Sequence, residues 1–251
     1  MTQTTGSVDT PLSETHHSEA EAEAEAGAGA GVVAGASWGV PVALIVLSLF
    51  PVIAGSLRVL EVAGGPHLLP ANPRIAAVPA PLVVHVIAAA VYALLGSLQF
   101  SARLRRSRIN WHRRSGRLLV GAGMLVAVSG LWMTLFFIAA PGGDLLWAVR
   151  LLVGTAMAAS IVLGFTAIRR RDIAAHRAWM IRAYALAVGA GTQLYTQGIG
   201  EGISGTSDLS TAISVSSGWV INATVAEWVI RRPSIRRARR TRTYTAPAGS
   251  P

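Results

Sequence analysis

The chain carries its apolar residues in blocks of about 20, and this feature limits its possible folds more than any other. A helix of that length spans the ~30 Å hydrocarbon core of a bilayer. Only 14% of the residues are charged, whereas a soluble domain usually carries about 25%. The sequence therefore predicts an all-α, polytopic transmembrane bundle with six spanning helices. The six blocks cover about 37–56, 81–100, 117–140, 145–168, 178–197 and 209–230.

Arginine clusters at the ends of these blocks predict how the bundle is oriented. They follow the second, fourth and sixth blocks, whereas the three links on the other side hold only Arg58 and Arg74. Cytoplasmic loops carry an excess of basic residues, so we expect both termini in the cytoplasm and the chain in the cytoplasmic membrane. The clusters are Arg103, Arg105, Arg106, Arg108, Arg113, Arg114 and Arg117; Arg169, Arg170, Arg171 and Arg177; and Arg231, Arg232, Arg236, Arg237, Arg239, Arg240 and Arg242.

The net charge of +10 is explained by this topology. We therefore expect anionic lipid at the arginine clusters and no nucleic-acid partner. A homo-oligomer is left open by the sequence. The absence of cysteine excludes disulfides, iron–sulfur clusters and thiolate zinc sites.

Both ends of the chain have the composition of disordered segments. Residues 1–36 contain Glu-Ala and Gly-Ala repeats, with six acidic residues and no arginine or lysine, and residues 231–251 are rich in arginine. Such segments cannot bury enough apolar surface to offset the entropy of ordering. We expect two disordered tails around a membrane domain that covers residues 37–230.

Polar residues near the cytoplasmic ends of the blocks form a predicted inner layer. Polar groups at membrane depth are costly and are therefore candidates for function. Counting residues from the block ends puts Arg182 and Glu227 at equal depth, which predicts an ion pair, more plausibly a structural tie than a catalytic pair. The whole layer consists of His112, Arg113, His176, Arg177, Arg182, Asn222 and Glu227.

His112 and His176 allow a more specific hypothesis. They lie at matched depth on different helices, and a b-type haem needs two imidazoles that face one iron. Each is followed directly by an arginine, Arg113 and Arg177. The alternative is therefore a pair of interfacial His-Arg sites that bind lipid phosphate or cap a helix.

A predicted outer layer contains His85, Arg150 and Gln193. Each lies four or five residues from the outer end of its block, or ~6–8 Å below the boundary. Together they would form a small polar pocket able to hold an anion or a carbonyl group. The structural alternative is that Arg150 extends to the headgroups and His85 binds a backbone carbonyl.

Several segments resemble a known family. His85 fits the histidine near the start of that family's first core helix, and the resemblance covers roughly residues 80–232. The family is the predicted bacterial membrane proteins of domain of unknown function family 2306, and the high arginine and alanine content is similar to its actinobacterial members. The resemblance implies an integral membrane protein and no particular activity. The segments are Leu98-Gln99-Phe100, Trp111-His112-Arg113-Arg114, Gly116-Arg117, His176 to Ala185, Trp219-Val220-Ile221-Asn222 and Glu227-Trp228.

Three functions are compatible with these residues. The first is a membrane protein whose polar layers are structural or bind lipid or a small ligand. The second is a redox protein with one haem b between His112 and His176. The third is a small transporter or proton-coupled carrier that uses the pairs Arg182–Glu227 and His85–Arg150. Whether the chain is an enzyme, and which cofactor it uses, is not decided by the sequence.

Overall fold

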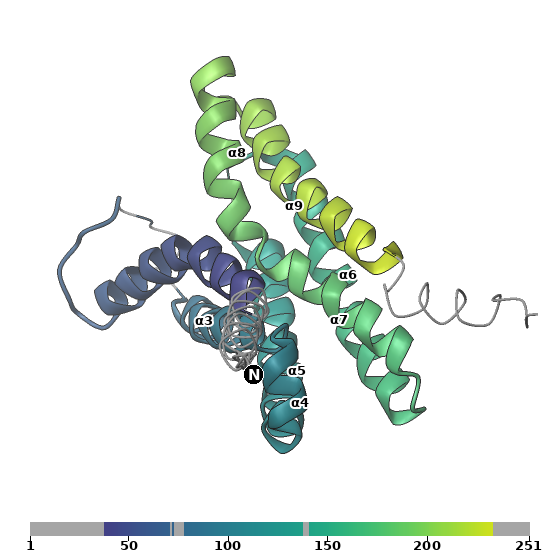
Figure 1. Ribbon diagram of the computed structural model, residues 1–251. Coiled ribbons are helices and arrows are strands. Elements are labelled where there is room, and N and C mark those ends of the chain that lie inside the picture. The colour runs from purple at the N-terminus through teal and green to yellow at the C-terminus, as the bar shows by residue number, and fades with distance from the viewer. Residues whose placement is uncertain (1–37, 71, 73–77, 138–140, 233–251) are drawn as a thin grey trace, which may run out of the picture.

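A computed structural model describes residues 38–70, 72, 78–137 and 141–232, and every regular element in this part of the chain is a helix (Figure 1). The predicted disordered segments, 1–36 and all but the first two residues of 231–251, lie outside the described residues. The helices are Trp38–Val62, α3 (Ala80–Leu98), α4 (Ala102–Ser107), α5 (Ile109–Phe136), α6 (Gly143–Arg169), α7 (Ile173–Ala187), α8 (Gly189–Ser204) and α9 (Asp208–Arg231).

Five of the described helices are long and apolar enough to cross a membrane: Trp38–Val62, α3, α5, α6 and α9. The fifth predicted span, 178–197, is instead divided between α7 and α8, which have 15 and 16 residues and meet at Val188. Each segment alone is shorter than the ~20 residues that a spanning helix needs. The all-α bundle is therefore confirmed, with five candidate spans and one broken helix.

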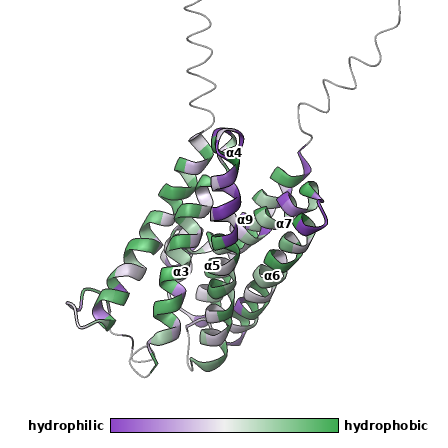
Figure 2. Ribbon diagram, turned by 90° about the horizontal axis from the view of Figure 1, so that it is seen from below, coloured by the Kyte–Doolittle hydropathy of each residue, from purple (hydrophilic) through white to green (hydrophobic). Residues whose placement is uncertain are grey.

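Hydrophilic residues gather at one end of the bundle, which we call the basic end. It comprises α4, the turn between α6 and α7, and the last residues of α9. Figure 2 shows hydrophilic ribbon at α4 and at the turn between α6 and α7. The links that follow α3 and α6 thus bring their arginines to the same end.

The helices at the basic end begin earlier than the apolar blocks predict. α5 begins at Ile109 and α7 at Ile173, where the blocks begin at 117 and 178. Arginine is a good helix former, so each helix extends past its apolar part. As a result His112 and His176 are each the fourth residue of a helix.

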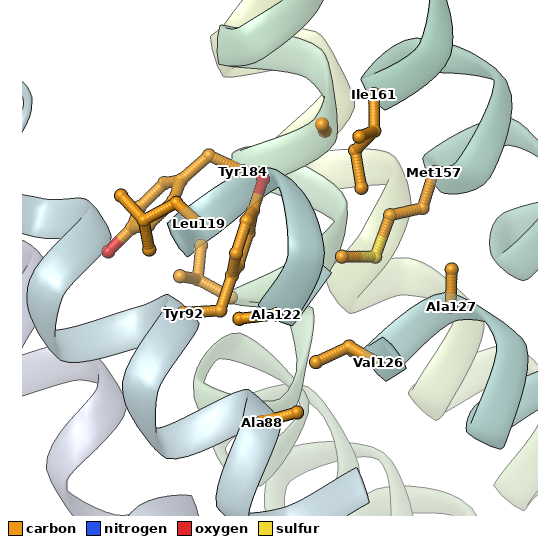
Figure 3. Packing of buried hydrophobic residues seen from close by; sticks show 11 residues of the cluster. Ala88, Tyr92, Leu119, Ala122, Val126, Ala127, Met157, Ile161 and Tyr184 are labelled. Atoms are coloured by element: carbon orange, nitrogen blue, oxygen red, sulfur yellow. The ribbon is translucent and has the colours of Figure 1, made fainter. Parts of the chain in front are cut away.

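The core lies where α3, α5, α6 and α7 meet. Its centre is a group of buried side chains that includes Tyr92 and Tyr184 (Figure 3). The Tyr184 hydroxyl donates to the Ala93 carbonyl at 2.7 Å and so ties α7 to α3. A Cβ atom at Gly96 would lie 2.6 Å from the Tyr184 ring, so only glycine allows this approach. The cluster is Ala88, Tyr92, Leu119, Ala122, Val126, Ala127, Met157, Ile161, Ala183, Tyr184 and Val188.

The break between α7 and α8 is stabilised by α9. At a break, the last carbonyls of the first helix lose their helical partners. Trp219 donates its indole N–H to the Leu186 carbonyl at 3.2 Å, and Asn222 donates its amide to the Ala185 carbonyl at 3.1 Å. Gly189 has no side chain that would collide with the Trp219 ring. Broken helices are tolerated inside a membrane when neighbours satisfy the freed groups in this way.

Candidate functional site

Side chains from three helices and from Gln99, which follows α3, form a polar cluster at the basic end, which we call the His–Arg cluster. α3 ends beside it, α4 packs on α5, and α5 and α7 begin in it. The cluster consists of Gln99, Arg105, His112, Ser115, His176 and Arg177.

Gln99 connects α3 to α5. Its Nε2 donates to the Ser115 hydroxyl at 2.7 Å, and that hydroxyl in turn donates to the Trp111 carbonyl at 2.7 Å. Arg105 donates to the Gln99 carbonyl at 3.2 Å, which brings α4 into the same network. The Gln99 Oε1 atom is buried and has no hydrogen-bond partner within the described part of the chain.

His112 lies one turn before Ser115 on α5. Its ring is within electrostatic range of Arg105, His176 and Arg113. The Nδ1 atom is buried and, among the residues described, has no hydrogen-bond partner. A buried polar atom without a partner is uncommon in proteins and calls for an explanation such as a bound ligand.

Arg105 and Arg177 bring two permanent positive charges to the cluster. Partial burial, followed by the charges of Arg177 and Arg106, lowers the pKa of Arg105. The nearby acidic residue Asp172 uses its carboxylate to accept from the Ala175 N–H at the start of α7. The two arginines are exposed beside the half-buried histidines, and the cluster therefore combines like charges that an anion would relieve.

His176 is oriented by the helix before it. Its Nδ1 lies 2.8 Å from the Gly164 carbonyl. A carbonyl only accepts, so Nδ1 carries the proton, and a neutral ring then has its lone pair on Nε2. A hydrogen bond of this kind prepares a histidine for an anion, when protonated, or for a metal, when neutral.

Arg182 and Glu227 form the ion pair that their depth predicts. The contact is bidentate, with Arg182 Nε 2.5 Å from Oε1 and Nη2 3.1 Å from Oε2 of Glu227. Arg182 also stacks on Trp179, 4.6 Å from the ring centroid, and Arg231 lies 3.6 Å from Glu227. Every contact joins α7 to α9 or neighbours on one helix, so we interpret the pair as a structural tie.

Asn222 has a different environment from the rest of the predicted inner layer. It lies more than one turn before Glu227 on α9 and binds Thr192 as well as the Ala185 carbonyl. The oxygen and the NH2 group of its side-chain amide are therefore both hydrogen-bonded at the break between α7 and α8.

Two of the predicted outer-layer residues, His85 and Gln193, contact different helices, α5 and α9. His85 binds the Val126 carbonyl at 3.1 Å and the Ser129 hydroxyl at 3.0 Å, both on α5. Gln193 packs on Gly218 of α9, and its buried Nε2 has no partner in the described chain. Arg150 lies on α6 and is engaged in an interaction. The His85 contacts match the structural alternative for that residue.

Gln99, Arg105 and Ser115 were not predicted as site residues from the sequence. Gln99 lies in one of the segments that resemble the known family, and this was the available signal for it. Arg105 was one of many similar arginines, and Ser115 was one of many serines in a helix. Their importance follows from how the ends of α3 and α4 meet α5, which residue counts do not reveal.

The comparison with known proteins agrees with this architecture. The model of a family described as predicted membrane protein (DUF2306) matches residues 82–230, more than half of the chain. The chain belongs to the DUF2306 family. It is thus a multi-pass membrane protein, and the match includes α5, α6, α7 and α9 with both histidines of the cluster. No curated protein and no solved structure matches the chain.

Proposed function

We propose that this DUF2306 protein spans the cytoplasmic membrane six times and binds an anionic group at the His–Arg cluster on its cytoplasmic face. In this proposal α7 and α8 together form one kinked crossing, and the basic end faces the cytoplasm. The positive-inside rule supports this orientation, because six crossings put every arginine cluster on one side.

The charge of the cluster is the observation that carries the proposal. Arg105 and Arg177 lie within electrostatic range of each other, and His112 lies within range of Arg105 and His176. These neighbouring like charges attract an anion, and a phosphate or carboxylate would offset them. Anionic lipid headgroups lie at the depth of α4 in the proposed topology, so a lipid phosphate is the first ligand to test.

Lipid titration tests this function. We expect the purified protein to bind an anionic phospholipid more tightly than phosphatidylcholine, with affinity that falls as salt rises. A basic residue near the surface contributes about 1 kcal/mol to anionic-lipid binding. Arg105→Gln should therefore weaken the binding about fivefold.

Arg108→Gln is the matched control for this titration. It removes the same charge from the same end of the bundle, but Arg108 lies at the start of α5 and outside the cluster. Equal losses of lipid affinity in Arg105→Gln and Arg108→Gln would mean that the effect comes from general surface charge. That result would contradict a specific site.

A b-type haem between His112 and His176 is the second candidate. The hydrogen bond from His176 Nδ1 to Gly164 favours it, because the lone pair on Nε2 is the one that ligates iron. Haem would supply electron transfer, and Arg105 and Arg177 would face its propionates. A Soret band that is lost in His176→Ala supports this candidate, and a colourless protein from haem-replete cells contradicts it.

A further inference from the structure

We infer that the ligand of the His–Arg cluster is a phosphate ester whose alcohol part carries a free hydroxyl, and that Gln99 accepts a hydrogen bond from that hydroxyl. The inference rests on the proposed function, because it names the chemical class of the anion at the same site.

The orientation of the Gln99 amide is determined by Ser115. The Ser115 hydroxyl donates to the Trp111 carbonyl at 2.7 Å, and its oxygen accepts from Gln99 at 2.7 Å. The group that faces Ser115 is therefore the Nε2 donor. Oε1 is left as a buried acceptor, and it can be satisfied only by a donor from outside the described network.

The neighbouring arginines supply donors, not acceptors, to a ligand. The guanidinium groups of Arg105 and Arg177 carry only N–H donors. Phosphate oxygens match both of these groups, but they cannot satisfy Gln99 Oε1. A ligand that fits the whole cluster therefore needs anionic oxygens and, beside them, one O–H donor.

A glycerol phosphate group has this combination of groups. It is present in the headgroup of phosphatidylglycerol and also in soluble glycerol 3-phosphate. A phosphodiester with a plain alkyl alcohol, such as phosphatidylethanol, has the same charge but no hydroxyl. It would leave Gln99 Oε1 buried without a partner, which costs binding energy.

The test compares these two lipids on the full-length protein in neutral detergent. Native mass spectrometry measures the affinity of the first bound lipid for phosphatidylglycerol, phosphatidylethanol and phosphatidylcholine. One hydrogen bond to a buried acceptor predicts that phosphatidylglycerol binds roughly threefold to tenfold more tightly than phosphatidylethanol. Competition by glycerol 3-phosphate assigns the site to a free phosphate ester, and a lack of competition assigns it to the lipid.

Gln99→Met removes the acceptor and keeps the size of the side chain. Because it also removes the Nε2 donor to Ser115, its overall affinity can fall, but it should abolish the preference for phosphatidylglycerol over phosphatidylethanol; thermal unfolding shows whether the variant is folded. Gln193→Met is the matched control, because it alters a half-buried glutamine that packs on α9, away from the cluster, and should keep the preference.

The outcomes separate this inference from the proposed function. Equal binding of phosphatidylglycerol and phosphatidylethanol, both tighter than phosphatidylcholine, overturns the role of Gln99 but leaves an anion site. Equal binding of all three lipids overturns both. The comparison on the unmodified protein decides the matter even if Gln99→Met does not fold.

Discussion

At the scale of single residues, the contacts of charged groups separate structural from ligand-binding candidates. Arg182 has a bidentate carboxylate partner and an aromatic ring, so both faces of its charge are satisfied within the chain. Arg105 instead lies within electrostatic range of Arg177 and of His112. A charge with a complete set of partners stabilises the bundle, whereas neighbouring like charges favour a bound anion.

Glu227→Gln tests the structural role of the ion pair. It leaves Arg182 without its carboxylate, and we expect the free energy of unfolding to fall by about 1 kcal/mol. This value is at the low end for such pairs because 30% and 34% of the two side chains are exposed. Thermal unfolding in detergent measures the change.

The double variant Arg182→Gln/Glu227→Gln provides the control. It removes both charges, so it should regain part of the lost stability, because no unpaired arginine is left. If the two residues do not interact, the losses of stability in Arg182→Gln and Glu227→Gln simply add in the double variant. Additive losses would therefore contradict the ion pair.

Sequence reasoning predicted the ion pair but only part of the cluster. Depth follows from residue counts, so Arg182 with Glu227 and His112 with His176 could be matched along the helices. The rotation and contacts of each helix do not follow from counts. For that reason Asn222 was grouped with the predicted inner layer although it serves the break between α7 and α8, and Gln99 was not selected although it belongs to the cluster.

At the scale of elements, the junctions between helices depend on particular side chains and backbone conformations. The break between α7 and α8 depends on Trp219 and Asn222 of α9. The turn between α6 and α7 places Arg171 in the left-handed region, with φ 62°, where glycine is favoured. Hydropathy reveals neither feature. Because the break is not visible in the hydropathy, the sequence predicted one continuous fifth span.

Trp219→Phe tests the stabilisation of the break. It removes the donor to the Leu186 carbonyl and keeps an aromatic ring, so the free energy of unfolding should fall by about 1–3 kcal/mol. Trp228→Phe is the matched control on the same helix, because Trp228 is 55% exposed. Thermal unfolding measures the change. Equal losses of stability in both variants would contradict the stabilising role of Trp219 at the break.

Arg171→Gly tests the strain in the turn between α6 and α7. Glycine adopts positive φ without a steric penalty, and after allowing for its greater freedom in the unfolded chain we expect a gain of about 0.5–1 kcal/mol. Arg170→Gly, at φ −82°, removes the same charge from an ordinary conformation and should not stabilise the protein. A loss of stability in Arg171→Gly would contradict the prediction.

At the scale of the whole molecule, the proposed function depends on which end of the bundle faces the cytoplasm. Apolar blocks and arginine clusters predicted the all-α bundle and the position of five helices, because burial in lipid dictates both. The sixth crossing depends on α7 and α8 acting together, since each is too short alone. Six crossings put Ser107 and the link between α8 and α9 on opposite sides.

Cysteine labelling tests this topology without background from the protein itself, because the chain has no cysteine. Thr206 lies in the link between α8 and α9 and is exposed, as is Ser107 at the end of α4. We expect Thr206→Cys to react with a membrane-impermeant maleimide in intact cells, and Ser107→Cys to react only after the membrane is opened. Labelling of both positions from the same side would show that α7 and α8 do not cross the bilayer.

A crystal structure grown in a lipid phase that contains phosphatidylglycerol tests the central claim most directly. We predict a phosphate between Arg105, Arg177 and the two histidines, with a headgroup hydroxyl at hydrogen-bond distance from Gln99 Oε1. A cluster closed on itself, with Gln99 Oε1 and His112 Nδ1 bound to protein groups and no anion beside the arginines, would contradict it.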